Sequence, residues 1–225
     1  MLNRPVEHGV VAVHARQLAL DARLRLAPLV GVPLLLCGLT LQLLVQQSAA
    51  TVPVAALTVL AGMVAALLAR PHQRQIARSR AGIRAERRVA ARLRRCGAAA
   101  VVHNLKIPGR GDVDHVVLGP FAVAVETKHG RGRPTPLGDG RLRVGGKVLP
   151  RDPVGQAERA ATAVQARLGV PVVPVVAVAD ASGPPQRAGA VWICSARQLP
   201  AVLARLPQVW SDPAAAQRAA AQLVG

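Results

Sequence analysis

The sequence predicts a two-helix membrane hairpin followed by an α/β domain in which helices flank both sides of a mixed sheet. Three observations lead to this fold class. The stretch from Leu26 to Ala69 contains no charged residue, helical and strand patterns alternate after it, and Val172–Ala179 is a continuous apolar run typical of a strand buried on both faces. With 225 residues, the chain is long enough for one domain of ordinary size and an appendage.

The uncharged stretch divides into two apolar segments, about 26–45 and 52–69, joined by the short polar link QQSAAT. Each approaches the roughly 20 residues that span a bilayer, so a helical hairpin is expected to embed residues 26–69 in the lipid. Arginines flank both ends, and the positive-inside rule then puts both termini and the following domain in the cytoplasm of a multi-pass cell-membrane protein. A cleaved signal peptide ending near Ser48-Ala49-Ala50 is the alternative, which the charged lead-in and the second apolar segment disfavour.

The domain boundaries follow from this division. We expect a cytoplasmic N-terminal segment (1–25), the hairpin (26–69), a basic juxtamembrane linker (70–77), the α/β domain (78–205) and a C-terminal tail with a short helix (206–225).

The charge favours a polyanionic partner. Lys and Arg number 29 against 11 Asp and Glu, a formal net charge of +18. Residues 70–95 hold ten arginines and one acid, and they fit either an anchor on anionic lipid or a face that binds nucleic acid phosphates. The chain has only three aromatic residues, which argues against single-strand binding by base stacking. Its three cysteines show neither a zinc nor a disulfide spacing.

The soluble elements are expected in the order α-β-β-β-α-β-β-α. The expected ranges are a helix over 74–96 ending near Gly97, a strand over 99–105, a hairpin over 113–127, a short strand pair near 141–149, a helix from Pro153 to Leu168, strands over 172–179 and 190–195, and a helix over 196–205.

The hairpin carries an unusual set of charges. If Gly119-Pro120-Phe121 connects its strands, Asp114 lies opposite Glu126, where Cβ atoms are about 4.5–5.5 Å apart and like charges repel. Side chains alternate along a strand, so Lys128 shares the face of Glu126. The repulsion would raise one carboxyl pKa unless a cation lies between the two groups. The pattern therefore predicts a Mg²⁺ site, which Mn²⁺ is also expected to fill.

Glu86 is a third acidic residue of interest. Ile83, Glu86, Ala90 and Leu93 follow helical spacing, which puts this carboxylate in the apolar stripe of an arginine-rich helix. A carboxylate turned toward the core needs a partner. That partner is either a neighbouring arginine or the predicted acidic cluster.

Four motifs together resemble a known family. They are Gly82-x-x-x-Glu86, Val113-Asp114-His115, Val125-Glu126-Thr127-Lys128 and Asp152-Pro153-x-x-Gln156. In this order and spacing they are similar to the nuclease-related domain, NERD, of the PD-(D/E)xK nuclease superfamily, over about residues 78–205. The resemblance implies a restriction-endonuclease-like mixed sheet. Ala85 stands where the family usually has a second glycine, a change that a helix tolerates.

The resemblance also implies roles. Asp114 and Glu126 would be metal ligands, with the Thr127 backbone carbonyl as a possible third, and Glu86 would complete the acidic cluster. Lys128 would orient or activate the attacking water. Gln156 would hold Lys128 or a DNA phosphate, unless it is an ordinary exposed helical residue. The implied chemistry is metal-assisted hydrolysis of a phosphodiester.

The amino-acid type at position 128 supports this role from the residues alone. Only three of the 29 basic residues are lysines, and a compact ammonium suits a water-facing role better than a guanidinium. His115 points away from Asp114 and is expected to pack or donate a hydrogen bond, with a ligand role as the alternative. His129 and the loop arginines could contact a nucleic acid backbone or be solvated loop residues; these arginines are Arg110, Arg131 and Arg133.

The expected function is that of a membrane-anchored, metal-dependent nuclease that hydrolyses DNA with little sequence specificity. Two alternatives remain: a non-catalytic NERD-derived module that binds nucleic acid or a partner at the membrane, and a basic membrane protein whose soluble domain is only a scaffold. The sequence does not predict an oligomeric state.

Overall fold

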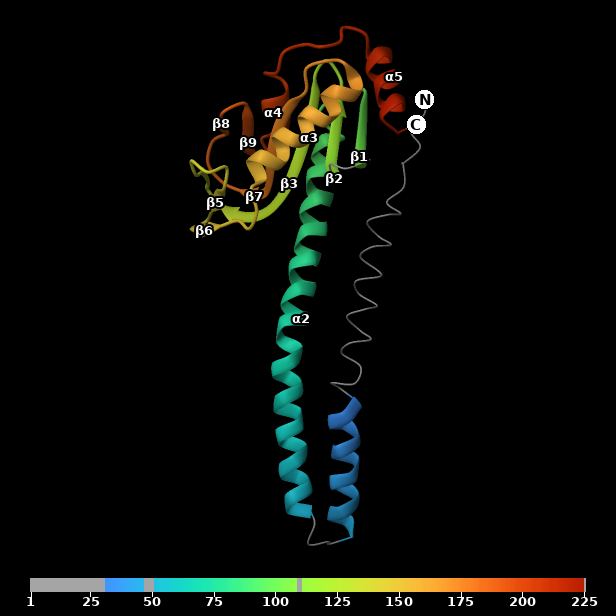
Figure 1. Cartoon of the computed structure of the whole chain (residues 1–225), viewed down its shortest axis with the longest axis vertical. Coiled ribbons are helices and arrows are strands. Elements are labelled where there is room, and N and C mark those ends of the chain that lie inside the picture. Colours follow the sequence, from blue (N-terminus) through green and yellow to red (C-terminus); the bar gives the residue numbers. More distant parts are fainter. Residues whose placement is uncertain (1–30, 47–50, 109–110, 225) are drawn as a thin grey trace. The chain divides into compact units, whose positions relative to one another are not determined.

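The computed structural model describes residues 31–46, 51–108 and 111–224 (Figure 1). The chain divides into two compact units, with the boundary between Arg80 and Ala81. One unit contains the apolar helices and the other contains the α/β domain. Helix α2 (Thr51–Leu93) begins in the first unit and ends in the second.

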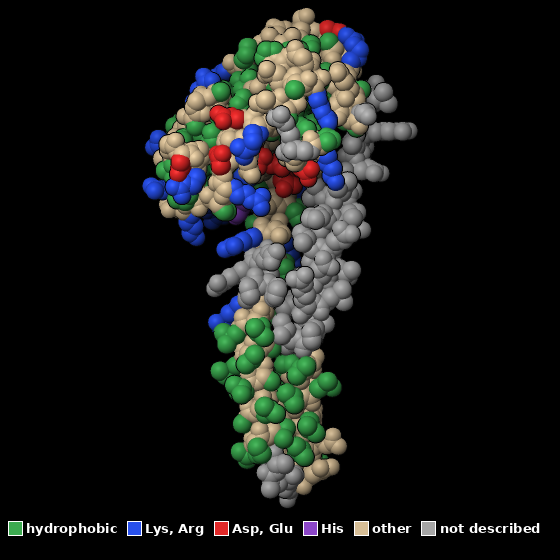
Figure 2. All heavy atoms as spheres, in the orientation of Figure 1, with side chains coloured by type: hydrophobic (Ala, Val, Ile, Leu, Met, Phe, Trp, Pro, Cys, Tyr) green, Lys and Arg blue, Asp and Glu red, His purple; other side chains and the backbone are tan. Residues whose placement is uncertain are grey.

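In the helical unit, Val52–Arg70 of α2 is long and apolar enough to cross a membrane. Its mean hydropathy is 2.3, and apart from Ala69 its side chains are not buried within the protein. Figure 2 shows apolar side chains in the lower part of the picture with no Lys, Arg, Asp or Glu among them, and the first basic residue of α2 is Arg70. The helix Gly31–Val45 is apolar but shorter than a full span. The first predicted segment begins at residue 26, outside the described residues, so the complete hairpin stays a prediction.

A polar contact links the two apolar helices. The Thr40 and Thr58 hydroxyl oxygens lie 3.0 Å apart. Each is also 2.8 Å from the backbone carbonyl oxygen four residues earlier, on Leu36 and Val54 respectively. Hydroxyl contacts between helices in apolar surroundings contribute on the order of 1 kcal/mol. This pair contributes to the contact between the two helices.

Residues 70–77, expected to be a linker, instead continue helix α2. Apart from Pro71, this segment consists of residues that a helix accommodates, so one proline does not end it. The helix therefore starts well before residue 74, where the sequence placed it. It ends at Leu93, and Gly97 follows with a positive φ of 68°.

The domain is built on a mixed sheet, as the sequence predicts, and this sheet has six strands. The spatial order is β1-β2-β3-β7-β9-β8. The strands are β1 (Ala100–Ile107), β2 (Gly111–Leu118), β3 (Ala122–Gly132), β7 (Val173–Ala181), β8 (Gln186–Ala188) and β9 (Val191–Ser195). β3, β7 and β9 are parallel, whereas β1, β2 and β8 join antiparallel. The parallel β3–β7 pair requires a crossover, which contains α3 (Pro153–Leu168).

Helices pack on both faces of this sheet. On one face α3 and α5 (Pro213–Val224) pack against a core that includes Val116, Ala124 and Val164. On the other face the end of α2 and the short α4 (Leu199–Leu203) enclose the second core. Alternate residues of β7 belong to the two faces and are fully buried, which confirms the prediction of a strand buried on both sides.

A three-stranded sheet follows β3 along the chain. It consists of β4 (Pro134–Pro136), β5 (Leu142–Val144) and β6 (Lys147–Val148), of which the sequence predicted only the last two. β4 and β8 have three residues each, too few to produce a periodic pattern. The tail helix is confirmed as α5, while the helix expected over 196–205 shortens to α4.

Candidate active site

The β2–β3 hairpin has the register expected from its connection. His115 pairs with Val125 and Leu118 with Ala122, so the next positions along the strands, Asp114 and Glu126, face each other. The paired positions of β2 and β3 end at His115, and Asp114 therefore lies where β2 leaves β3. This is the point at which the chain can turn a side chain toward the neighbouring backbone.

Asn104 marks the same point on the other side of β2. It lies across from Asp114, between the pairs His103–His115 and Leu105–Val113, and it has a positive φ of 52°. Asparagine is among the few non-glycine residues that adopt this conformation readily. The local change in β1 accompanies the break in pairing at Asp114. Asn104 is thus a backbone irregularity beside Asp114 that the sequence pattern did not reveal.

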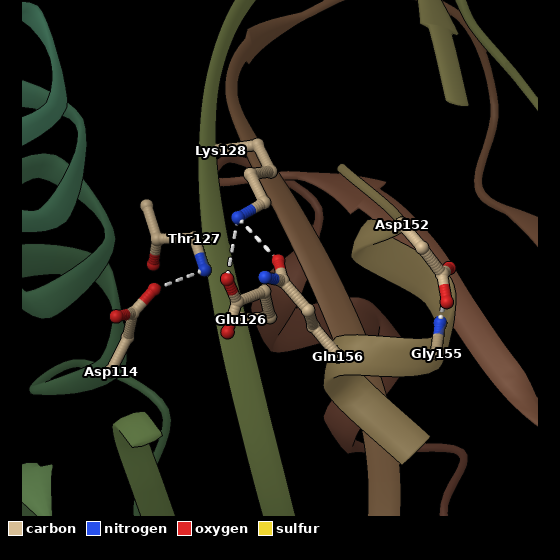
Figure 3. A network of polar contacts seen from close by, with 7 residues as sticks. All are labelled: Asp114, Glu126, Thr127, Lys128, Asp152, Gly155 and Gln156. Atoms are coloured by element: carbon tan, nitrogen blue, oxygen red, sulfur yellow. Dashed lines mark hydrogen bonds and ion pairs between the residues drawn. The ribbon is translucent and has the colours of Figure 1, made fainter. Parts of the chain in front are cut away.

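Asp114 is held by the backbone of β3. Its Oδ2 accepts a hydrogen bond of 2.7 Å from the Thr127 N–H (Figure 3). The N–H and C=O of one residue in an extended strand point to the same side, so the Thr127 carbonyl also faces the Asp114 side. The Thr127 hydroxyl is buried and has no hydrogen-bond partner among the described residues. Several oxygen atoms therefore gather beside Asp114.

Lys128 joins β3 to α3. Its Nζ donates to Glu126 Oε1 at 2.6 Å and to Gln156 Oε1 at 2.9 Å. Figure 3 shows Glu126, Lys128 and Gln156 converging on one side of the strand, with Asp114 approaching from the other. The side chains of Lys128 and Glu126 are only 21% and 12% exposed, so their ion pair is well shielded from water.

The start of α3 sets the position of Gln156. Asp152 is the N-cap, and its Oδ1 accepts from the Gly155 N–H at 2.7 Å. Pro153 follows at the first helical position, where its fixed φ suits a helix start. Gln156 consequently lies in the first turn, facing Lys128. The prediction of a helix start at Pro153 is confirmed.

The acidic side chains influence one another strongly. Burial, and then the Glu126 carboxylate, raises the pKa of Asp114 to about 7, against smaller opposing effects of the Thr127 N–H and Lys128. Burial and Glu126 also raise the pKa of Glu86. Glu86 is half-buried and makes no ion pair within the described part of the chain. Glu86 therefore interacts with the other acidic residues of this cluster and not with an arginine.

These residues suit a hard divalent cation by their chemistry. Their donors are oxygens, as Mg²⁺ prefers, and a cation would relieve the repulsion that raises the pKa values of Asp114 and Glu86. Within residues 31–46, 51–108 and 111–224, however, no three His, Cys, Asp or Glu side chains already form a ligand group. The reason is visible in the contacts: Lys128 engages Glu126, and the Thr127 N–H engages Asp114.

His115 is buried and contacts another histidine. Its Nδ1 lies 2.8 Å from His103 Nδ1, and the two rings meet edge to face. Burial, with a contribution from His103, lowers the pKa of His115 to about 3, so the imidazole stays neutral. His115 pairs with Val125 and therefore lies on the face opposite Glu126 and Lys128, and its contact with His103 fits a packing and hydrogen-bonding histidine.

The structure describes three of the four residues that were predicted to contact a nucleic acid backbone. Arg131 lies on β3 beyond an irregularity in the β3–β7 ladder, paired in register with Asp180. His129 and Arg133 are exposed and form no hydrogen bond or ion pair in the described chain. Arg110 lies outside the described residues.

The mixed sheet and its polar cluster define a nuclease-like α/β domain. Residues 81–179 match the family model of the nuclease-related domain. No curated protein and no solved structure matches the chain. Residues 81–179 are therefore similar to a nuclease-related domain, NERD, and this similarity indicates a nuclease-like function.

The raised pKa of Asp114 predicts a pH effect on stability. A carboxyl whose pKa is about 7 when folded and about 4 when unfolded stabilises the fold when protonated. This contribution is fully present below about pH 4 and is lost as the pH rises through 7. In EDTA, we expect the melting temperature of the wild type to fall between pH 4.5 and pH 8. This fall should be roughly 5–10 °C larger than the corresponding change in Asp114→Asn.

The measurement is the intrinsic fluorescence of Trp192 and Trp210, both in the domain, during heating at each pH. Comparison with the Asn variant cancels other titrating groups, including His115, whose lowered pKa acts in the opposite direction. Parallel curves for the two proteins would show that Asp114 is not perturbed.

Proposed function

We propose that this protein is a membrane-anchored, metal-dependent phosphodiesterase that cuts DNA with little sequence specificity. The observation that carries the proposal is the contact of Lys128 with both Glu126 and Gln156, beside the acidic residues Asp114 and Glu86. A nuclease-related domain matching residues 81–179 supports the same class of reaction.

Mg²⁺, or Mn²⁺ in its place, would be held by Asp114, Glu126, Glu86 and the Thr127 carbonyl, and when bound it polarises a phosphate oxygen and lowers the pKa of water. Lys128 carries a compact ammonium in a shielded position, where it can orient a water molecule and offset negative charge on the phosphorus oxygens. Gln156 keeps that ammonium in place from α3.

The excess of positive charge supports a nucleic acid substrate. A formal net charge of +18 attracts polyanions, and contacts to phosphates rather than base edges give affinity without sequence preference. The substrate is identified by incubating the full chain and Mg²⁺ with four nucleic acids in turn: supercoiled plasmid, linear duplex, single-stranded DNA and RNA. Nicking of the plasmid that is stopped by EDTA supports DNA endonuclease activity. Cleavage of RNA alone, or only from the ends of a strand, would contradict the DNA endonuclease part of the proposal.

Binding without cutting is the second candidate. The direct Lys128–Glu126 pair favours it, because Lys128 then occupies an oxygen that a metal site would need. Such a module would retain DNA binding in EDTA and show no cleavage with any divalent ion. The plasmid assay separates these two functions.

Gln156 provides a milder test of the site. Replacing it with alanine removes one of the two acceptors of Lys128 Nζ and leaves the Glu126 contact. We expect cleavage to fall about 10- to 100-fold, since a misplaced catalytic group costs rate without abolishing it. The measurement is the single-turnover rate on a labelled oligonucleotide. Gln165→Ala, on the same helix, is the control, and equal rates for the two variants would remove Gln156 from the site.

The membrane arrangement is also part of the proposal. Val52–Arg70 supplies one candidate span, and residues 26–45 are proposed to supply the other, with both termini cytoplasmic. A phosphatase–fluorescent protein reporter pair fused after Gly225 is expected to be fluorescent and to lack phosphatase activity. A reporter active outside the cytoplasm would overturn this topology.

A further inference from the structure

The domain contains a basic hollow that is separate from the acidic cluster. It has a volume of about 530 Å³ and lies among α2, the ends of β3 and β7, and the segment after β9. We call it the arginine hollow; its charged lining residues are Arg88, Arg92, Arg95, Arg131, Asp180 and Arg197. Alanines form the rest of its wall, which leaves the charged groups unobstructed.

Four of the five guanidinium groups are available for a ligand. Arg88 donates to Asp180 and forms an ion pair with it. Arg92, Arg95, Arg131 and Arg197 are exposed and form no ion pair among the described residues. Like charges gathered in one concavity repel each other, and a bound anion would remove this repulsion.

The shape and the type of donor point to phosphate. A guanidinium presents a planar fork of N–H donors that matches phosphate oxygens in pairs, and all five cations here are arginines. The volume falls within the range of about 300–1,000 Å³ that ligand pockets occupy, so several phosphate groups would fit. Arg88 and Arg92 are four positions apart on α2 and therefore lie on one helix face, and Arg95 follows in the turn after the helix.

The hollow and Lys128 lie near the same end of the neighbouring strands β3 and β7. Lys128 pairs in register with Val178 of β7, and Arg131 pairs with Asp180 two residues later. Two residues of a strand extend about 7 Å. One strand of a nucleic acid duplex carries a phosphate about every 3.4 Å of helix axis. A strand whose phosphate lies at Lys128 therefore has further phosphates within reach of the hollow.

We propose that the arginine hollow binds backbone phosphates of the nucleic acid strand about two nucleotides from the bond positioned at Lys128. This inference rests on the proposed function, because it takes the substrate to be a nucleic acid. It adds a binding site and a direction: the strand passes from the β3–α3 side at Lys128 toward the segment after β9.

The test measures DNA binding without cleavage. The full chain in phosphatidylcholine nanodiscs, in EDTA, is titrated against a fluorescent 20-nucleotide DNA, and anisotropy gives the dissociation constant at several salt concentrations. The triple variant Arg92→Gln/Arg95→Gln/Arg197→Gln is compared with a matched control of equal charge, Arg187→Gln/Arg205→Gln/Arg218→Gln. The three control positions are exposed and lie outside the hollow.

We expect the hollow variant to bind about 10- to 100-fold more weakly and to lose about 2 from the slope of log K against log salt, as for three lost phosphate contacts. The control should change by less than about threefold. The single variant Arg197→Glu, at an exposed position after β9, should weaken binding in the same direction and guards against misfolding of the triple variant.

Three results would overturn the inference: equal losses in both triple variants, unchanged binding in the hollow variants, or no DNA binding by the wild type. Competition identifies the source of the phosphate. A soluble short-chain phosphatidylglycerol that displaces DNA from the wild type but not from Arg197→Glu would assign the hollow to lipid headgroups instead. Binding is measured in EDTA, so it does not depend on cleavage. If the wild type does not cut DNA but the hollow variants still bind it more weakly than the control variant, the proposed cleavage is refuted and the proposed binding site is supported.

Discussion

Lys128→Ala is expected to lower the rate of DNA cleavage by about 10²–10⁴-fold while DNA affinity changes less than about threefold. The ammonium of Lys128 is shielded and contacts Glu126 and Gln156. Burial and the Glu126 carboxylate raise the pKa values of Asp114 and Glu86. No other cation of the described chain forms an ion pair with Glu126, so no neighbouring residue can take the place of the Lys128 ammonium.

The measurement is a single-turnover rate at saturating protein, together with anisotropy for binding and a melting curve for folding. Lys147→Ala, an exposed lysine on β6, is the matched control and should cut at the wild-type rate. Lys128→Arg should fail to restore cleavage, because a planar guanidinium does not replace a compact ammonium at this position. A Lys128→Ala protein that cuts within threefold of the wild type would contradict this role.

Asp114→Asn is expected to abolish cleavage and to remove the stabilisation by Mg²⁺. In the wild type at pH 8, 10 mM Mg²⁺ should stabilise the domain by about 1–3 kcal/mol, as a ligand does at roughly 10 to 100 times its dissociation constant. At pH 5 the effect should be much smaller, because Asp114, with a pKa of about 7, is protonated there. Asparagine keeps the shape of the side chain but lacks the charge.

Melting temperatures with and without Mg²⁺, at both pH values, measure this effect. Asp112→Asn changes an exposed carboxylate two residues away and should behave as the wild type. If Mg²⁺ stabilises Asp114→Asn as much as the wild type, the ion binds elsewhere in the chain.

The elements with long, clear patterns were predictable from the sequence. Helix α3 begins at Pro153 and ends at Leu168 as expected, since a capping aspartate, a proline at the first turn and a following glycine define both ends. Strand β7 was evident from its continuous apolar run. The segment 70–77 was misread as a linker because helix propensity over a few residues cannot show that helices on both sides will join.

The site was predictable only in part. The connection at Gly119-Pro120-Phe121 sets the register, and this was enough to place Asp114 against Glu126. The conformation of Asn104 was not predictable, because it is a local departure of the backbone that leaves no periodic signal. The arginine hollow could not be predicted either, since its residues come from four segments that only the folded sheet brings together.

Cleavage of supercoiled plasmid by the purified full chain tests the central claim most directly. In Mg²⁺, the wild type should convert the plasmid to nicked and linear forms. The same protein in EDTA, and Lys128→Ala in Mg²⁺, should leave it intact. Plasmid that stays supercoiled with the wild type in both Mg²⁺ and Mn²⁺, while anisotropy shows that it is bound, would contradict the claim and identify the domain as a binding module.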